Sequence, residues 1–249
     1  MSRRICAERP VPLFHFTELS STNAMAARLI KCGAPFPFCV VAERQTMGHG
    51  RRQRPWSSVT GNLHMTVALR LPFADADLSI LPFISALALA EPWLPAHDIR
   101  FKWPNDLMVA DRKVGGIWIG VENLGGWVAR IGMGLNLAAV PPKTKVAGAL
   151  GLERDLDAVA QGVFGHLWEL CQAVAHGLGP ALLTRWQERA YGLGGPVSVT
   201  LDHGQKLDGI FLGLAADGAM RLWNADKECL IVQGDVEVIS GRGPTTSIE

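Results

Sequence analysis

The hydrophobic pattern of this chain changes near residues 192–196. Before that point, apolar stretches with strand periodicity alternate with stretches of helical periodicity. After it, four or five short β runs are separated by turn residues. Three glycines and a proline mark the change, as expected where regular structure is interrupted. The sequence therefore predicts an α+β domain at residues 1–192 and a small all-β domain at residues 193–249.

Helices and strands of the larger domain are predicted from local patterns. A helix is expected over about 156–177, a second over 181–190, and a buried one over 78–90, which is too short to span a bilayer. The first of these presents one apolar face. That face consists of Val159, Val163, Leu167, Leu170 and Val174.

The segment GHGRRQRPW at residues 48–56, here called the Gly/Arg loop, joins two predicted strands. Gly48 and Gly50 lack a β-carbon, so their backbone N–H groups can approach a ligand closely. Arg51, Arg52 and Arg54 add fixed positive charge. The loop is predicted to bind an anion, and a solvated basic loop or a nucleic-acid patch is the alternative for this segment alone.

Three other segments carry polar groups on predicted strands or turns. KWPND presents Lys102 and Asp106 on a turn that is stiffened by Pro104. A reversal is expected at Asp111-Arg112, with Lys113 just before a Gly-Gly step, and GMGLN ends at Asn136. Each has a structural alternative, namely a plain turn, an exposed lysine, or a glycine-spaced strand that packs closely.

The order and spacing of these motifs closely resemble those of the biotin protein ligases. The matching segments are SSTN at 20–23, AERQxxGxGRRxRxW at 42–56, GNLHMT at 61–66, KWPND at 102–106, DRKVGGI at 111–117 and IGMGLN at 131–136. The resemblance implies a catalytic domain of the class II aminoacyl-tRNA synthetase-like, biotin–lipoate ligase type, with a mixed sheet, flanking helices and a C-terminal SH3-like β-barrel. No helix-turn-helix pattern precedes Phe14, so a form without a DNA-binding domain is expected.

The resemblance also implies a reaction. ATP and Mg²⁺ would convert biotin to biotinyl-5′-AMP, and biotin would then pass to a lysine of a biotin carboxyl carrier protein. Arg51, Lys113 and Lys102 would stabilise the negative charge that develops, and Asp106 would hold Mg²⁺. Residues expected at biotin are Ser21, Thr22, Asn23, Gln45, Gly48, His49, Gly50, Arg51, Lys113 and Gly115. Those expected at ATP or the adenylate are Arg51, Arg52, Arg54, Trp56, Lys113 and Asn136.

Some of these residues have competing roles. Ser-Thr-Asn before a helical run is also an ordinary N-cap pattern, with Thr22 or Asn23 as the capping residue. A tryptophan such as Trp56 is more often a packing residue.

This sequence departs from the family pattern at three places. His49 and Gln53 stand at the second and sixth positions of a loop that usually reads GRGRRGR. Gly120 stands where an acid is expected, and Glu122 follows two residues later on the same strand face. A side chain at position 53 restricts the loop backbone in a way that glycine does not.

Composition fits such an enzyme. The 249 residues carry a formal net charge of +1, which does not favour nucleic acid as a partner. No signal peptide is indicated, and the five cysteines lack metal spacing, so we expect a cytoplasmic protein with reduced, buried thiols and no zinc. The sequence leaves open whether the protein forms a homodimer. A lipoate or octanoate ligase and a non-catalytic binder are the alternative functions.

Overall fold

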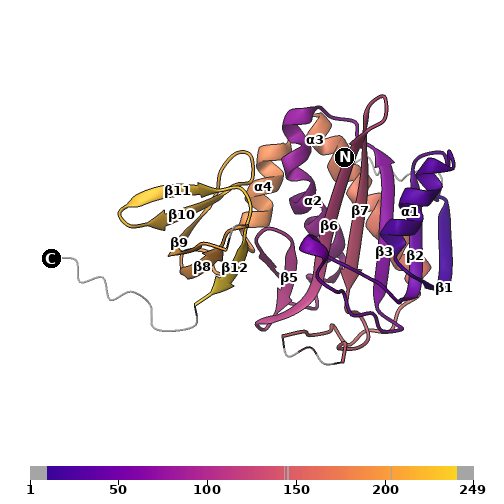
Figure 1. The fold of residues 1–249 in the computed structure, drawn as a ribbon, viewed down its shortest axis with the longest axis horizontal. Helices are drawn as coiled ribbons and strands as arrows, with labels where there is room; N and C mark the ends of the chain where they lie inside the picture. The colour runs from indigo at the N-terminus through magenta and orange to yellow at the C-terminus, as the bar shows by residue number, and fades with distance from the viewer. Residues whose placement is uncertain (1–9, 143, 145, 203, 240–249) are drawn as a thin grey trace.

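The computed structural model describes residues 10–142, 144, 146–202 and 204–239. Within these residues the chain forms two sheets that lie side by side, with helices between and around them (Figure 1). No helix among the described residues is long and apolar enough to cross a membrane.

The larger sheet has seven strands in the order β1-β2-β3-β7-β6-β5-β4. The β1 and β2 strands pair in parallel, and every other neighbouring pair is antiparallel, so the predicted mixed sheet is confirmed. The strands are β1 (Leu13–Leu19), β2 (Phe38–Gln45), β3 (Leu63–Arg70), β4 (Arg100–Lys102), β5 (Asp106–Val109), β6 (Arg112–Asn123) and β7 (Trp127–Leu135).

Helices cover both faces of this sheet because its strands are apolar on both sides. On β2, Val40 packs with Ala26 of α1, whereas the neighbouring Val41 belongs to the main core. The main core lies on the face that is covered by α2 and α3. The helices are α1 (Thr22–Lys31), α2 (Leu81–Ala90), α3 (Leu156–Ala175) and α4 (Gly179–Gln187), with short 3₁₀ segments η1 (Arg51–Gln53), η2 (Asp75–Ile80) and η3 (Glu91–Trp93).

The smaller sheet has five antiparallel strands in the order β11-β10-β9-β8-β12. It is consistent with the predicted SH3-like domain, although the pairings of the described strands form an open sheet and not a closed barrel. Its strands are β8 (Pro196–Thr200), β9 (Lys206–Leu214), β10 (Met220–Asn224), β11 (Lys227–Ile231) and β12 (Asp235–Val238).

The two sheets share one hydrophobic core. Phe211 of β9 belongs to the same buried cluster as Trp186 of α4 and Phe83 of α2. A turn of the smaller sheet also contacts the larger part: the Trp103 indole N–H donates to the Gly218 carbonyl at 3.0 Å. A division of the chain at residues 192/193 stays a prediction.

Most predicted elements are confirmed, with small shifts at their ends. The helix predicted over 156–177 is α3, and four of its five predicted apolar residues are buried, while Val159 is partly buried. Residues 78–90 divide into the end of η2 and the buried α2, which begins one residue before Pro82. The reversal predicted at Asp111-Arg112 is centred one residue earlier, since Ala110 and Asp111 both have positive φ.

Two predictions about single residues were wrong. Ser21, not Thr22 or Asn23, is the N-cap of α1, and its hydroxyl accepts the Ala24 N–H. The cysteines are not uniformly buried, because Cys32 is exposed. Cys39 and Cys171 are buried, and burial raises the pKa of each thiol to about 12. Cys6 lies outside the described residues.

Candidate active site

A cavity lies on the face of the larger sheet that α1 partly covers. Its floor is formed by glycines of β6 and β7, because Gly116 is the cross-strand partner of Gly134, and Gly132 is the partner of both Trp118 and Thr66. Cross-strand partners point to the same face of a sheet. Three positions without side chains therefore adjoin one another and leave a hollow.

Trp56 lies directly on this glycine floor. A β-carbon at Gly134 would be 2.4 Å from the Trp56 ring, so this position needs glycine, and one at Gly116 would be in tight contact with the ring at 3.1 Å. The Trp56 indole nitrogen is buried and has no hydrogen-bond partner, which is unusual for a buried donor. The cavity holds about 130 Å³, below the roughly 300–1,000 Å³ of common ligand pockets.

One end of the cavity carries uncharged polar groups. The Thr22 backbone N–H donates to Gln45 Oε1 at 2.8 Å, and the Thr22 hydroxyl donates to the same oxygen at 3.1 Å. The Thr66 hydroxyl donates to Thr22 Oγ at 2.9 Å. These bonds fix the short polar side chains of α1, β2 and β3 at one place on the cavity wall.

A buried histidine is linked to this polar end through Ser58. Ser58 Oγ accepts the Gln45 backbone N–H at 2.9 Å and lies 3.1 Å from His64 Nε2. His64 Nδ1 lies 3.3 Å from the Ala42 carbonyl. This arrangement fits a neutral imidazole with its proton on Nδ1. Burial lowers the pKa of His64 to about 4, although hydrogen bonds to the backbone oppose this shift.

The other end of the cavity carries charge. Lys113 Nζ lies 2.6 Å from Asp106 Oδ1 and 5.5 Å from the centre of the Trp56 ring. Arg51 donates to Asn105 Oδ1 at 3.2 Å and to the Gly234 carbonyl at 3.4 Å. Burial lowers the pKa of Arg51, and the nearby Asp235 carboxylate opposes that effect. Arg54 and Asp235, which pair with each other, also line the cavity, so this end presents three cations and two carboxylates.

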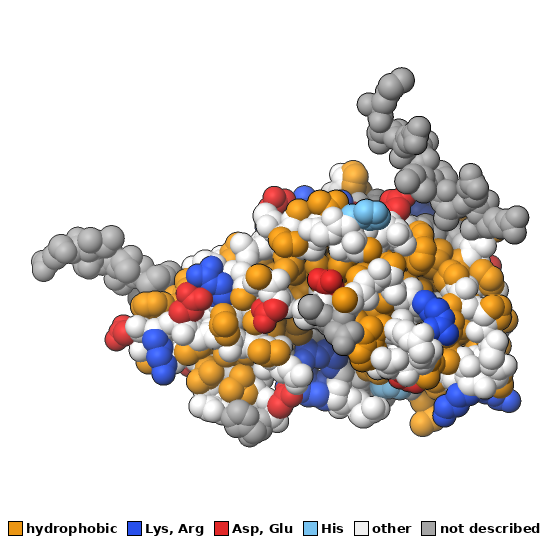
Figure 2. All heavy atoms as spheres, turned by 90° about the horizontal axis from the view of Figure 1, so that it is seen from above, with side chains coloured by type: hydrophobic (Ala, Val, Ile, Leu, Met, Phe, Trp, Pro, Cys, Tyr) orange, Lys and Arg blue, Asp and Glu red, His pale blue; other side chains and the backbone are white. Residues whose placement is uncertain are grey.

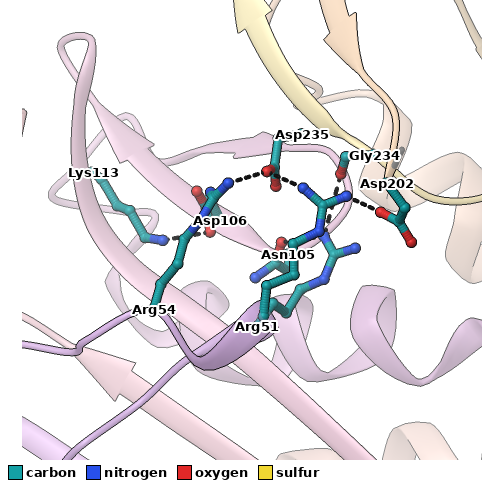
Figure 3. Close-up of polar contacts among 9 residues, drawn as sticks. Arg51, Arg54, Asn105, Asp106, Lys113, Asp202, Gly234 and Asp235 are labelled. Atoms are coloured by element: carbon teal, nitrogen blue, oxygen red, sulfur yellow. Dashed lines mark hydrogen bonds and ion pairs between the residues drawn. The ribbon is translucent and has the colours of Figure 1, made fainter. Parts of the chain in front are cut away.

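The Gly/Arg loop forms a closed hairpin over the cavity. The Trp56 N–H donates to the Gly48 carbonyl, and the Gly50 N–H donates to the Arg54 carbonyl, both at 2.8 Å. The smaller sheet holds the loop, because Asp235 of β12 pairs with both Arg52 and Arg54. Figure 3 shows the pair with Arg54. Arg52 pairs in addition with Asp202 of the turn after β8. The loop is thus fixed by charges that come from the far end of the chain.

Gln53 stands in a backbone conformation that favours glycine. Its φ is +57°, and that of Arg52 is +51°. The loop pattern that the sequence resembles usually has a glycine at this position. An L-residue in the left-handed region is disfavoured by roughly 1–2 kcal/mol, so the loop carries strain at this point.

The cavity brings together most of the residues predicted for the site. Its lining includes eleven of them: Ser21, Thr22, Asn23, Gln45, His49, Gly50, Arg51, Arg54, Trp56, Asp106 and Lys113. Five predicted residues lie outside the lining: Gly48, Arg52, Lys102, Gly115 and Asn136.

The residues outside the lining have other contacts. Asn136 is buried, and its amide donates to the Gly148 carbonyl at 2.9 Å and accepts from Asn62 at 3.3 Å. Gly115 packs against Gly134, and Gly48 lies against Trp56 and Gln45. Lys102 is the cross-strand partner of Asp106, on the same face but beyond the cavity. The ligand contacts predicted for these residues stay predictions.

Several residues that line the cavity were not predicted from the sequence. They are Pro55, Met65, Thr66, Asn105, Gly116, Ile117, Trp118, Gly132, Met133, Gly134 and Asp235. The period-two glycines of GMG were the available signal for the floor, since both point to one face of a strand. Asp235 had no comparable signal, because it reaches the cavity only through the packing of the two sheets.

Glu122 does not replace the missing acid at the cavity. Its carboxylate pairs with Arg130 Nη2 at 2.7 Å, and it is absent from the described cavity lining. A magnesium site made by protein groups alone is also not found, because no three metal-binding side chains cluster among the described residues. Asp106 fits Mg²⁺ only as one carboxylate that acts together with substrate phosphates, which is the usual arrangement for this ion.

Comparisons with known proteins agree with this geometry. Residues 16–137 match the model of the Biotin/lipoate A/B protein ligase family. The chain is 32% identical to a biotin–[acetyl-CoA-carboxylase] ligase of Paracoccus denitrificans over 81% of this chain and 90% of that one. It is 30% identical to the bifunctional ligase/repressor BirA of Escherichia coli over 73% of this chain and 60% of that one.

The fold has a close match among solved structures. The biotin protein ligase of Aquifex aeolicus, in complex with biotin and ATP, superposes with a TM-score of 0.79 at 24% identity and covers 92% of this chain and 98% of that one. This likeness shows that the fold is shared, and the sequence match to the Paracoccus denitrificans ligase shows the family. The chain belongs to the biotin protein ligase family.

Proposed function

We propose that this protein is an ATP-dependent biotin protein ligase. In the first step, the biotin carboxylate attacks the α-phosphate of ATP, which forms biotinyl-5′-AMP and releases pyrophosphate. In the second step, the ε-amine of a carrier-protein lysine attacks the acyl carbon, which forms an amide bond and releases AMP. The carrier is the biotin carboxyl carrier domain of a biotin-dependent carboxylase.

The charged end of the cavity suits both steps. Negative charge develops on phosphate oxygens in the first step and on the acyl oxygen in the second. Arg51 and Lys113 are held at this end by contacts with Asn105 and Asp106, so their charges are positioned before the reaction begins. Preorganised cations at such positions lower the barrier without reorganisation during the reaction.

The polar end suits the ureido ring of biotin. That ring offers one carbonyl acceptor and two N–H donors, so it needs short polar groups in an otherwise apolar slot. Thr22, Gln45 and Thr66 supply such groups through one hydrogen-bonded chain. The valeryl arm would then cross the glycine floor toward Arg51 and Lys113.

Magnesium would enter with ATP. Bound Mg²⁺ would neutralise phosphate charge. Asp106 would contribute a ligand to the ion, since its carboxylate lines the cavity beside Lys113. For Asp106 to hold the ion, its pair with Lys113 must loosen, which would free the ammonium group for the phosphate.

The single observation that carries this proposal is the layout of one cavity. An uncharged polar end and a cationic end face each other across a floor of three glycines. A nucleic-acid binder would have a broad positive surface instead. On the face in Figure 2, Lys and Arg side chains are scattered among acidic and apolar ones.

Pyrophosphate exchange with biotin and MgATP tests the first step. Arg51→Ala and Lys113→Ala should each reduce exchange by about 10²–10³-fold, because each removes one preorganised donor. Arg44→Ala and Lys206→Ala are matched controls, since these exposed residues lie on β2 and β9 outside the cavity lining, and they should leave exchange unchanged. Unaltered exchange in both cavity variants would refute these assignments.

The same assay separates the alternative functions. Biotin, lipoate and octanoate are compared side by side, followed by transfer of the accepted acid to a purified carrier domain. Exchange with lipoate or octanoate but not with biotin would assign the protein to the lipoate branch of the family. Exchange with none of the acids would favour a non-catalytic binder.

A further inference from the structure

Asn62 is a fully buried asparagine that the proposed reaction does not use. It lies just before β3, whose first residue, Leu63, pairs with Leu135 at the end of β7. Asn136 follows Leu135 and is also buried. Two asparagines therefore meet where these strands begin and end. A buried polar side chain costs free energy unless it is hydrogen-bonded, so the contacts of this pair show what it holds in place.

The side chain of Asn62 makes all four hydrogen bonds that an amide can make. Its Oδ1 accepts the N–H groups of Ala138 and Ala139, both at 3.0 Å. Its Nδ2 donates to the Ala139 carbonyl at 2.8 Å and to Asn136 Oδ1 at 3.3 Å. The two backbone donors at Oδ1 fix which side of the Asn62 amide is the oxygen, so Nδ2 must face Asn136.

The contact with Asn62 fixes the Asn136 amide in turn. Because Asn136 Oδ1 accepts from Asn62, the Asn136 Nδ2 faces the other way and donates to the Gly148 carbonyl at 2.9 Å. A reversed Asn136 amide would set its oxygen against the Gly148 carbonyl oxygen, and its NH₂ group against that of Asn62. Asn62 therefore selects the one orientation of Asn136 that holds Gly148.

Gly148 holds the strand residue that carries a cation of the cavity. Its N–H donates to the Lys113 carbonyl, and the Lys113 N–H donates to the Val146 carbonyl, both at 2.8 Å. Residues 146–148 thus pair in parallel beside the start of β6. The backbone of Lys113 is held from this side, while its ammonium group is held by Asp106 (Figure 3).

We propose that Asn62 is a positioning residue for the reaction: through Asn136 and Gly148 it fixes the backbone from which Lys113 reaches the cavity. Asn62 contacts no substrate, since it is fully buried and lies outside the cavity lining. Its effect reaches the reacting atoms by way of Lys113. This inference rests on the proposed function, in which Lys113 stabilises the negative charge that develops.

Two variants of Asn62 separate positioning from simple support of a turn. Asn62→Ala removes all four bonds, whereas Asn62→Asp keeps an oxygen for the Ala138 and Ala139 N–H groups and loses the donor that orients Asn136. Both should lower kcat of pyrophosphate exchange with biotin and MgATP by about 10–100-fold, because a small misplacement of a reacting group costs up to about 10²-fold. Wild-type kcat in Asn62→Asp would overturn the inference.

Gly148→Ala disturbs the other end of the same connection and leaves Asn62 intact. The added β-carbon would lie 3.0 Å from Arg112 Cβ and 3.3 Å from Val114 Cγ1, so residues 146–148 must shift away from β6. This variant should also lower kcat, by about tenfold or more. A kcat equal to that of the wild type would count against the inference.

Asn123→Ala is the matched control for these variants. Asn123 is the last residue of β6, and its Oδ1 accepts the Gly126 N–H in the turn that leads to β7. The same substitution is thus made on the same strand pair, at the end away from Lys113. The kcat of Asn123→Ala should equal that of the wild type.

A double-mutant cycle shows whether Asn62 acts through Lys113. In a Lys113→Ala background, Asn62→Ala should lower the remaining exchange by less than about threefold, because the group that it positions is gone. A further loss of about tenfold or more in this background would show that Asn62 affects the reaction by another route, and the inference would fail.

Amide hydrogen exchange, followed by NMR without substrates, tests the positioning independently of activity. In Asn62→Ala, the Lys113 and Gly148 amide protons should exchange at least about tenfold faster relative to the Cys39 amide, which donates to the Pro12 carbonyl. If the wild type shows no pyrophosphate exchange with any acid, the proposed function fails, and this measurement still decides whether Asn62 holds Lys113. No change, or an equal change at all three amides, would refute the inference.

Discussion

Lys113 Nζ lies 2.6 Å from Asp106 Oδ1, and this ion pair links the two charged groups of the cavity that the proposed reaction needs most. The two residues lie on adjacent strands: Lys113 is near the start of β6, and Asp106 is the first residue of β5, opposite Gly116. The pair keeps the lysine over the glycine floor and keeps the carboxylate at the cavity wall. Each group is thus held in place by the other, and in the proposed reaction MgATP would have to separate them.

Asp106→Asn should weaken the response to magnesium. If the carboxylate contributes to the ion, the Mg²⁺ concentration that gives half-maximal pyrophosphate exchange should rise by about tenfold or more. Asp111→Asn is a suitable control, because this aspartate accepts the Tyr191 hydroxyl outside the cavity. A magnesium curve that is identical for Asp106→Asn and the wild type would remove Asp106 as a metal ligand.

Asp235→Asn should release the Gly/Arg loop. The Asp235 carboxylate pairs with Arg52 and Arg54, so its removal leaves the loop held mainly by Arg51 and by Asp202. Trypsin cleaves after arginine, and we expect cleavage within residues 51–54 to become several-fold faster. The measurement is the rate of appearance of the two fragments by mass spectrometry.

The control for this experiment is Glu237→Gln, which removes a carboxylate two residues further along β12. Its cleavage rate should match that of the wild type. Equal rates in all three proteins would mean that the smaller sheet does not restrain the loop.

Gln53→Gly should not destabilise the protein, although glycine usually does. At φ +57° the substitution removes backbone strain. This gain offsets the destabilisation that comes from the greater freedom of glycine in the unfolded chain. Gln53→Val should instead lower the free energy of unfolding by roughly 1–2 kcal/mol, since a β-branched residue fits the left-handed region poorly. Urea unfolding of the three proteins measures both effects, and equal values for the glycine and valine variants would argue against strain at this position.

The sequence predicted the parts of the site that local chemistry determines. The Gly/Arg loop, Thr22 at the start of α1, and Lys113 before the Gly-Gly step were predicted from short motifs whose order and spacing resemble those of the biotin protein ligases, and the structure places all three at the cavity. The long helix α3 followed from hydrophobic periodicity, whereas the mixed sheet was an implication of the resemblance to the biotin protein ligases. The loop and the helix depend on residues that are near one another in the chain.

The parts that were missed depend on register and on distant packing. Thr66 and Gly132 meet because β3 pairs with β7, and a shift of one residue in that pairing would put the two positions on opposite faces of the sheet. Asp235 reaches Arg52 across 183 positions of sequence. Neither relationship is encoded in a local pattern, so the sequence alone could not reveal them.

The buried His64 should make the protein lose stability in acid. Its folded-state pKa is about 4, below the ordinary value of 6.5, so the unfolded chain binds the proton more readily than the folded protein does. The contribution of His64 to the free energy of unfolding is therefore fully present above about pH 6.5 and is lost as the pH falls toward 4. The loss is about 3 kcal/mol, because each pKa unit corresponds to about 1.4 kcal/mol. Urea unfolding at pH 7.5 and pH 4 measures this loss, and His64→Asn, which does not titrate, should lose about 3 kcal/mol less than the wild type over the same interval.

His176→Gln, an exposed control at the end of α3, should lose as much as the wild type. If the wild type and His64→Asn lose the same free energy of unfolding, the acid sensitivity comes from other groups. The contacts of Ser58 with Gln45 would then not depend on a neutral imidazole at His64.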